Sequence, residues 1–359
     1  MSDTSQNSIY ILRQVAESIY KQLEKRQFPK IEIPQRTSSN VKLTKEGLVL
    51  ADKKIIKSSS KVSTVKSFAQ LCWLNYFACK LVESGKTTTL RDIYYSAQAY
   101  KDIMFKEQVE SNRIVEDLEA ITGLTREQFN IYPKQRAVIF GDLKFKYITP
   151  KPHIKNPNKI YELDEHPDGY VIGPELTNNA EFFECNADKI IVAEKQAVFQ
   201  RFIEEKVYEK FNALLVFTEG QPPRNCRLLV RKLSEQFNLP VYVLTDSDPW
   251  GLQIFLTLKY NSSNLAHVRN LNVPKAKWIG VYAEDITKYK LPTVKMTDKD
   301  LKKAKNMLTN DIRCKSNKFF IEQLKLWLKM KRKCELEAFS RYGLSFICDV
   351  YLKEKLAIS

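Results

Sequence analysis

The chain has 359 residues, more than one domain usually holds, so two or three domains are expected. Lysine and arginine number 58, and aspartate and glutamate number 42, which leaves a net charge of +16. An excess of this size indicates a polyanionic partner, most commonly DNA or RNA, although a basic surface without a partner has the same composition. No apolar run is long enough to span a membrane, which excludes a transmembrane helix.

The seven cysteines are scattered and never form a CxxC pair. This spacing argues against a disulfide framework and against a zinc site, and it favours a reducing, intracellular compartment. Glycine is rare, at ten residues, and neither GxxxxGKS, GxxxxGKT nor GxGxxG occurs. The chain therefore lacks the loops with which many proteins cradle the phosphates of a nucleotide.

The first 65 residues predict a helix followed by a connector. Over residues 1–30 apolar side chains recur at three- and four-residue spacing, which is typical of an amphipathic helix; they are Ile9, Leu12, Val15, Ile19 and Leu23. Residues 31–65 are mixed and polar, and they predict a connector that contains short strands.

Residues 66–150 have the element order of a winged helix-turn-helix domain. The expected elements are helices at about 65–82, after the N-cap threonines at 87–89, and at about 106–122, then strands at 137–140 and 143–147. Gly141-Asp142 between the two strands predicts a hairpin. Domains of this kind commonly lay a later helix against duplex DNA.

A proline-rich stretch, residues 151–185, predicts an interdomain connection with a hairpin at Asp168-Gly169. From residue 186 to 359 apolar runs alternate with helical patterns, which predicts an α/β domain with a parallel, Rossmann-like sheet. The expected strands are 189–193, 213–217, 241–244 and 278–282, and the expected helices are 195–210, 224–237, 249–259 and a helical region at 298–356.

Three acids follow two of these strands. Glu194 ends the first strand, and Asp246 and Asp248 follow the third. Functional groups of open α/β sheets gather beyond the carboxyl ends of the strands, so the three side chains are expected at one edge. Carboxylates that converge repel one another unless a hard cation lies between them, which favours a magnesium site. Alternatively the acids cap helices, and Asp248 before Pro249 is a good cap by itself.

Two further groups could act on a phosphate. Arg91 and Tyr95 are four residues apart and share a helix face, so the guanidinium could stabilise a phenolate, whereas Tyr94 should point elsewhere. Alternatively both tyrosines are packing residues, the interpretation that spacing alone favours. Arg224 and Arg227 follow a Gly-Pro turn at the start of a helix, where arginines either contact DNA phosphates or form an exposed basic face.

Several of these segments resemble one family. TLRDIYYS resembles the catalytic-tyrosine motif of the type IIB topoisomerase A subunits and the related meiotic double-strand-break proteins. IVAEK and LPVYVLTDSDPWGLQI resemble the two acidic motifs of a Toprim domain, and GQPPRNCRLLVRKL resembles the segment between them. RTSSNVKLTKEG resembles the N-terminal region of the family, so the likeness covers about residues 36–286.

The resemblance implies roles for the matching residues. Tyr95 matches the nucleophile that becomes linked to a DNA 5′ end, and Arg91 matches the arginine of the same motif. Glu194, Asp246 and Asp248 match the ligands of Mg²⁺. Glu219 departs from the glycine or lysine that many relatives have before the glycine, which puts the local phosphate contacts in doubt.

The family also implies partners: double-stranded DNA, a second copy of this chain, and a separate ATPase B subunit in an A2B2 heterotetramer. Each tyrosine would meet the acids of the other protomer, in a cytoplasmic, nucleoid-associated enzyme (nuclear in a eukaryote). The N-terminal helix is expected either to close the winged-helix core or to contact the B subunit. Two other functions remain open, a meiotic-type break initiator without resealing and a non-catalytic winged-helix DNA-binding protein.

Overall fold

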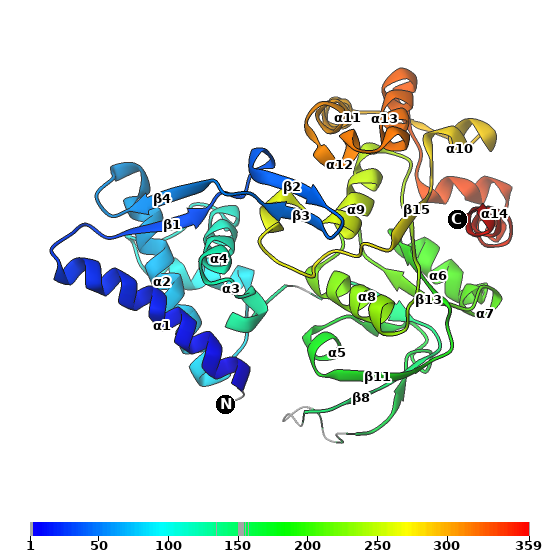
Figure 1. Cartoon of the computed structure of the whole chain (residues 1–359). Helices are drawn as coiled ribbons and strands as arrows, with labels where there is room; N and C mark the ends of the chain where they lie inside the picture. Colours follow the sequence, from blue (N-terminus) through cyan, green and yellow to red (C-terminus); the bar gives the residue numbers. More distant parts are fainter. Residues whose placement is uncertain (1–2, 134, 150–153, 155, 157, 359) are drawn as a thin grey trace. The chain divides into compact units, whose positions relative to one another are not determined.

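The computed structural model describes residues 3–133, 135–149, 154, 156 and 158–358 (Figure 1). The chain divides into two compact units. Unit 1 comprises Met1–Lys42, Leu48–Lys134 and Ser262–Arg269, and unit 2 comprises Leu43–Gly47, Gln135–Asn261 and Asn270–Ser359. Each unit has a buried core of its own.

Unit 1 is built on helices that each bury one apolar face. They are α1 (Asp3–Glu24), α2 (Val62–Ser84), α3 (Leu90–Ala97) and α4 (Gln108–Thr122), with short turns η1 (Ser38–Asn40), η2 (Arg126–Phe129) and η3 (Ser263–Leu265). Two strand pairs complete it: antiparallel β1 (Lys30–Pro34) and β4 (Lys54–Ser58), and parallel β5 (Thr88–Thr89) and β6 (Ile131–Tyr132). The residues of a further pair, β2 (Val41–Thr44) and β3 (Gly47–Leu50), are divided between the two units. Leu71, Leu74 and Leu118 are fully buried where the helices meet.

The predicted N-terminal helix is present as α1, but only part of its apolar stripe lies in the core. Ile9 and Leu12 are buried, and the backbone carbonyl of Leu12 accepts a hydrogen bond from Asn75 Nδ2 at 3.0 Å. Leu23, by contrast, is 54% exposed, and the aromatic side chains of Tyr10 and Tyr20 are exposed to a similar degree. Helix α1 therefore packs one face against the core of unit 1 and leaves Tyr10, Tyr20 and Leu23 at the surface.

The predicted hairpin of residues 137–147 is wrong. β7 (Val138–Phe140) and β8 (Leu143–Tyr147) are strands, but they pair in different sheets of unit 2. Gly141, at φ +134°, turns the chain between them, and a Cβ there would lie 3.1 Å from the carbonyl oxygen of Ala213. β7 pairs with β13 and β8 pairs with β11, so closeness in sequence does not decide the pairing of these two strands. The wing expected beside the helices of unit 1 is therefore absent from this segment.

The predicted interdomain connection is also corrected. Residues 150–153, 155 and 157 of that stretch lie outside the described residues, and its remainder supplies elements of unit 2. These are β9 (Tyr161–Glu162), β10 (Tyr170–Val171), α5 (Pro174–Asn178) and β11 (Ala180–Cys185). β9 pairs with β8 and β10 pairs with β7, so Asp168-Gly169 makes a turn without a hairpin. β8, β9 and β11 form a three-stranded sheet of their own.

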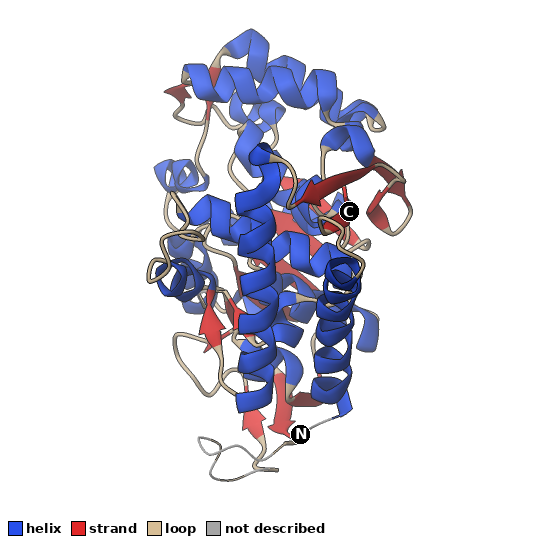
Figure 2. Ribbon diagram, turned by 90° about the vertical axis from the view of Figure 1, so that its left-hand side faces the viewer, coloured by secondary structure: helices blue, strands red, loops and turns tan. Residues whose placement is uncertain are grey.

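The main sheet of unit 2 has six strands in the order β10-β7-β13-β12-β14-β15. Its parallel part confirms the predicted α/β domain and consists of β12 (Lys189–Ala193), β13 (Ala213–Phe217), β14 (Val241–Leu244) and β15 (Ala276–Gly280). The connecting helices are α6 (Gln196–Glu204), α7 (Val207–Lys210), α8 (Arg224–Gln236) and α9 (Pro249–Tyr260). Figure 2 distinguishes the helices of the chain from its strands by colour.

Alternating side chains of each parallel strand enter the two cores on opposite faces of this sheet. In β12, Ile190 and Val192 belong to one core and Ile191 and Ala193 to the other. This two-residue period follows from strand geometry, in which successive side chains point to opposite faces. Because both faces are covered, the strands appear in the sequence as continuous apolar runs.

The C-terminal region is mainly helical, as predicted, and it returns to the edge of the main sheet. Its elements are α10 (Ala283–Lys288), β16 (Val294–Lys295), α11 (Asp298–Asn310), α12 (Ile312–Lys315), α13 (Lys318–Met330), β17 (Arg332–Lys333), η4 (Leu336–Tyr342), η5 (Ile347–Leu352) and α14 (Lys353–Ile358). After β17, Ser247 and Cys334 exchange backbone hydrogen bonds of 2.8 and 3.2 Å. None of the described helices is long and apolar enough to cross a membrane.

Candidate active site

Helix α3 of unit 1 holds the predicted nucleophile and has a well-formed N-terminus. Thr89 is the N-cap: its hydroxyl accepts from the backbone N–H of Asp92 at 3.2 Å, and the Asp92 carboxylate accepts from the backbone N–H of Thr89 at 3.1 Å. Hydrogen bonds from the Thr89 side chain and backbone also lower the pKa of Asp92. This capping box satisfies amides that α3 cannot pair internally, so the short helix begins at a defined residue.

Arg91 and Tyr95 meet on the exposed face of α3, as their spacing predicted. Arg91 Nη2 donates to the Tyr95 hydroxyl at 3.4 Å, and the guanidinium lies 5.7 Å from the centre of the ring. Tyr95 is 56% exposed, whereas Ile93 on the opposite face is fully buried and anchors the helix. Tyr94 turns toward the core of unit 1, and its ring edge remains in contact with Tyr95 at a centroid distance of 5.3 Å.

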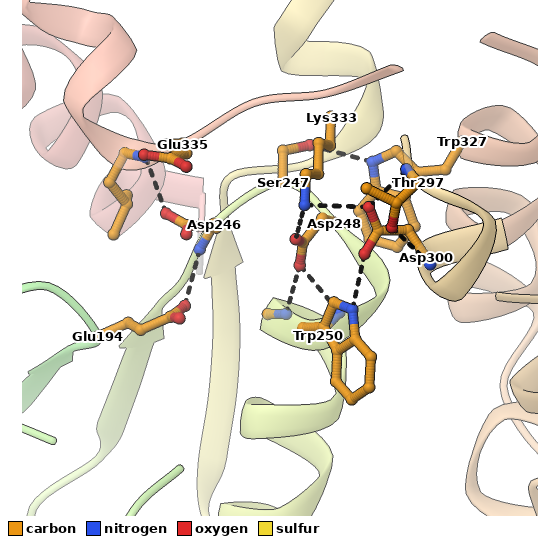
Figure 3. Close-up of polar contacts among 12 residues, drawn as sticks. Glu194, Asp246, Ser247, Asp248, Trp250, Thr297, Asp300, Trp327, Lys333 and Glu335 are labelled. Carbon is orange, nitrogen blue, oxygen red and sulfur yellow. Dashed lines mark hydrogen bonds and ion pairs between the residues drawn. The ribbon is translucent and has the colours of Figure 1, made fainter. Parts of the chain in front are cut away.

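In unit 2 the sheet brings Glu194 and Asp246 together. β12 and β14 are adjacent and parallel, so the residues that follow them lie at the same edge of the sheet. The Glu194 backbone N–H donates to the carbonyl of Leu244 at 3.1 Å, and Glu194 Oε2 accepts from the backbone N–H of Asp246 at 3.1 Å (Figure 3). Neither contact joins residues that are close in the sequence.

The Asp246 side chain is held on both oxygens. Oδ1 accepts from the backbone N–H of Leu336 at 2.9 Å, and Oδ2 lies 3.1 Å from Lys195 Nζ. The same ammonium lies 3.7 Å from Glu335 and 3.9 Å from Glu337. Burial is the largest single influence on the pKa of Lys195 and lowers it, but the attractions of Asp246, Glu337 and Glu335 together outweigh burial, so the net shift is upward and the lysine is charged at neutral pH.

Asp248 is turned toward α9 rather than toward the other two acids (Figure 3). Its Oδ1 accepts from the backbone N–H groups of Trp250 and Gly251 at 2.8 and 2.7 Å, so it caps the helix, as the alternative interpretation held. Its Oδ2 lies 3.8 Å from Lys333 Nζ, which itself lies 3.0 Å from Asp300. A Cβ at Gly251 would lie 2.2 Å from the carbonyl oxygen of Asp246, so this turn requires glycine.

The fold disfavours the anionic forms of these acids. Burial, and then repulsion from Asp246, raises the pKa of Glu194 to about 8. Burial raises the pKa of Asp246 to about 6 against the opposing effects of the Leu336 amide and Lys195, and it also raises the pKa of Asp248. Such carboxylates gain from a nearby cation, because it offsets the cost of their buried charge.

The arrangement fits a cation that needs few protein ligands. Among the described residues no three His, Cys, Asp or Glu side chains are grouped closely enough to form a complete metal cage. Mg²⁺ is commonly held by one or two carboxylates and completes its shell with water and substrate phosphate. Glu194 and Asp246 can supply that pair, and Asp248 lies beside them with one oxygen committed to its helix.

The sequence does not indicate the groups that support residues 245–248, the acidic loop that follows β14. Trp278 Nε1 donates to Thr245 Oγ1 at 3.0 Å, and Trp327 Nε1 donates to Ser247 Oγ at 3.2 Å. Lys195 lies in the IVAEK motif, but its position after Glu194 does not by itself indicate a role. Lys333 carries no local signal, because it reaches the loop only when β17 folds back onto it.

The predicted DNA contacts of Arg224 and Arg227 are not supported. Both side chains are buried, with relative exposures of 4% and 2%. Arg227 Nη1 donates to Asn261 Oδ1 at 3.0 Å and to the carbonyl of Thr257 at 3.4 Å, so it ties α8 to the end of α9. Glu219, the departure from the family pattern, is exposed and has a positive φ of 53°. A glycine would adopt that conformation more easily.

Comparison with known proteins places the two units in one family. The family model for the Toprim domain of topoisomerase 6 A subunits and Spo11 matches residues 189–356, and the model described as "Type IIB DNA topoisomerase" matches residues 66–131. The A subunit of type 2 DNA topoisomerase 6 from Methanothermobacter thermautotrophicus is 34% identical, over 96% of this chain and 96% of that protein. The same subunit of Archaeoglobus fulgidus is 33% identical over 99% of both chains, and that of Methanosarcina barkeri is 34% identical over 96% of this chain and 93% of that one. The chain therefore belongs to the family of type 2 DNA topoisomerase 6 A subunits, which are type IIB topoisomerases.

Proposed function

We propose that this chain is the DNA-cleaving subunit of a type IIB topoisomerase, which opens both strands of a duplex and reseals them. The observation that carries the proposal is the pair of carboxylates, half-buried Glu194 and buried Asp246, at adjacent strand ends of a Toprim domain. The exposed, arginine-bound hydroxyl of Tyr95 supplies a nucleophile of the right kind for transfer of a phosphodiester.

In the proposed reaction the hydroxyl oxygen of Tyr95 attacks a backbone phosphorus of DNA. A bond forms between this oxygen and phosphorus, the bond to the 3′ oxygen breaks, and the tyrosine proton ends on the released 3′ hydroxyl. The protein is then joined to the 5′ phosphate. Arg91, already on the same hydroxyl, stabilises the phenolate and the charge that develops on the phosphate. Attack by the 3′ hydroxyl reverses the step and reseals the strand, because the phosphotyrosine bond conserves the energy.

Mg²⁺ is the proposed metal. Glu194 and Asp246 would hold it, and Asp248, which caps α9, would complete the acidic edge that these three carboxylates form. When bound, the ion supplies positive charge to the phosphate or to the leaving oxygen. The raised pKa values of Glu194 and Asp246 support this assignment, because a divalent cation favours the carboxylate forms that burial disfavours.

Two copies of the chain are needed to cut two strands, and we propose that each Tyr95 works with the acids of the other copy. ATP is assigned to a separate B subunit, in an A2B2 complex that acts on duplex DNA at the nucleoid in the cytoplasm. The absence of a glycine-rich nucleotide-binding motif from the sequence agrees with this division of labour. We assign the contact with the B subunit to the exposed apolar side chains of α1.

The test is covalent trapping of DNA by the chain in the presence of ATP, Mg²⁺ and its B subunit. Tyr95→Phe removes only the attacking oxygen, so the adduct should be lost while DNA affinity changes less than about twofold. Tyr94→Phe is the matched control, because it removes a hydroxyl from the neighbouring, partly buried ring, and it should retain the adduct. An adduct that survives in Tyr95→Phe, or equal loss in both variants, would reject Tyr95 as the nucleophile.

A further inference from the structure

In both aspartates of the acidic loop, one carboxylate oxygen accepts backbone hydrogen bonds and the other lies near a lysine. In each, Oδ1 accepts backbone N–H groups, from Leu336 for Asp246 and from Trp250 and Gly251 for Asp248. In each, Oδ2 faces a lysine, at 3.1 Å for Asp246 and at 3.8 Å for Asp248. The oxygens that remain for a metal ion are therefore the ones that face an ammonium group.

The two lysines differ in which carboxylate lies nearest to the ammonium group. Lys195 lies closest to Asp246, and its second partners, Glu335 and Glu337, lie 3.7 and 3.9 Å away. Lys333 has the opposite preference, with its second carboxylate, Asp300, nearer than Asp248 at 3.0 Å against 3.8 Å. The carboxylate nearest to Lys333 is therefore Asp300, which is not a proposed metal ligand. The carboxylate nearest to Lys195 is Asp246, which is one.

We propose that Lys195 is a positioning residue that competes with Mg²⁺ for Asp246 Oδ2 and passes to Glu335 and Glu337 when the ion binds. This inference rests on the proposed magnesium site. An ammonium and a divalent cation on one oxygen repel each other, so one must leave. The flexible four-carbon side chain of lysine allows a short movement at little cost in free energy. The side chains of Glu335 and Glu337 are about half exposed, so they can adjust to the lysine.

The receiving carboxylates also explain why the move is useful. Glu335 and Glu337 flank Leu336, whose backbone N–H holds the other oxygen of Asp246. The transfer of Lys195 therefore places a cation on the segment that orients the metal ligand. In this way occupancy of the acidic edge becomes coupled to order in residues 334–337, which the sequence places far from both acidic motifs.

The competition is measured as Mg²⁺ affinity of the full chain without DNA, by titration calorimetry at constant ionic strength. Lys195→Met removes the competitor and should lower the dissociation constant about threefold or more, as expected for loss of a partly buried ion pair. Lys333→Met is the matched control, because it removes the same charge from the same loop, and its effect should be clearly smaller. Lys195→Gln is the second neutral variant, and melting in chelator verifies that each variant is folded.

A double-mutant cycle distinguishes the transfer of Lys195 to Glu335 and Glu337 from the general electrostatic effect of removing charges near the metal site. Glu335→Gln with Glu337→Gln should weaken Mg²⁺ binding about threefold in the wild-type background and have little effect beside Lys195→Met, where no ammonium needs a partner. An equal effect in both backgrounds, or Lys195 and Lys333 variants that bind Mg²⁺ alike, would overturn the inference. A wild-type chain that binds no Mg²⁺ in the presence of DNA as well would instead remove the proposed metal site on which the inference rests.

Discussion

Glu194 shows how burial at a single residue can be tested without measuring catalysis. Its pKa is about 8 in the folded chain, against an ordinary value of 4.5, because burial and then Asp246 disfavour the anion. Between these values the folded chain holds a proton that the unfolded chain has released. The stability linked to this proton is complete below the unfolded pKa and is lost as the pH rises through about 8.

Glu194→Gln should therefore raise the melting temperature in chelator at pH 8 and leave it nearly unchanged at pH 4.5. Glutamine keeps an oxygen for the Asp246 amide but carries no charge, so it resembles the protonated wild type. Added Mg²⁺ should stabilise the wild type and not the variant. Glu219→Gln, at an exposed residue just after β13, is the control and should show no such trend. A melting difference that is constant with pH would contradict the assignment.

Arg227 is a basic residue whose buried position gives it a structural role. Its guanidinium is buried and bonded to Asn261 and Thr257, so Arg227→Met leaves buried acceptors without a donor. The free energy of unfolding should fall by about 3 kcal/mol, which chemical denaturation measures. DNA affinity at a temperature where the variant is folded should stay the same. Lys302→Met, at an exposed lysine, should cost less than about 0.5 kcal/mol.

At the scale of elements, the sequence predicts best what is local. The strands 189–193, 213–217 and 241–244 are found as predicted, because each is a continuous apolar run bounded by polar residues. The fourth begins and ends two residues earlier than expected, at Ala276–Gly280. The acids Glu194 and Asp246 were found because they follow such strands directly.

What could not be predicted depends on contacts between distant residues. The strands of residues 138–147 resemble a hairpin locally, but their partners, β13 and β11, lie far along the chain. The hydrogen bond from Leu336 to Asp246 spans 90 residues, and no local pattern encodes it. The supporting lysines and the tryptophans of the acidic loop make contacts of the same long-range kind, so the sequence indicates the candidate ligands and omits the residues that hold them.

Helix α1 is the element whose surface carries a prediction. Deletion of the whole helix would remove Leu12 from the core, so loss of B-subunit binding after deletion would prove little. Tyr20→Glu with Leu23→Glu changes only exposed side chains, three residues apart on one face. This pair should weaken co-purification with the B subunit by about tenfold or more, the scale expected for loss of an apolar anchor, without lowering the melting temperature. Tyr76→Glu, equally exposed on α2, is the control, and an unchanged complex would exclude α1 as the contact.

At the scale of the whole molecule, charge separates DNA binding from DNA cleavage. The net charge of +16 reflects an excess of lysines and arginines, which can neutralise DNA phosphates. The acids of the proposed metal site instead repel the same phosphates. We therefore expect basic residues to hold the duplex, and the acidic edge to require a cation before it can approach a phosphate. Affinity and cleavage should respond to different ions.

Binding of the chain to duplex DNA should weaken steeply as monovalent salt rises, with log K falling by about 0.9 for each phosphate contact per decade of salt. Its dependence on base sequence should be slight, because phosphate contacts carry no sequence information. Chelation of Mg²⁺ at constant ionic strength should abolish the Tyr95 adduct and leave the DNA bound, which filter binding and denaturing gels measure on one sample. Salt-independent affinity would contradict phosphate recognition by the basic surface. An adduct that forms in chelator would show that Glu194 and Asp246 do not hold a metal needed for cleavage, and release of DNA by the chelator would assign Mg²⁺ to binding instead of chemistry.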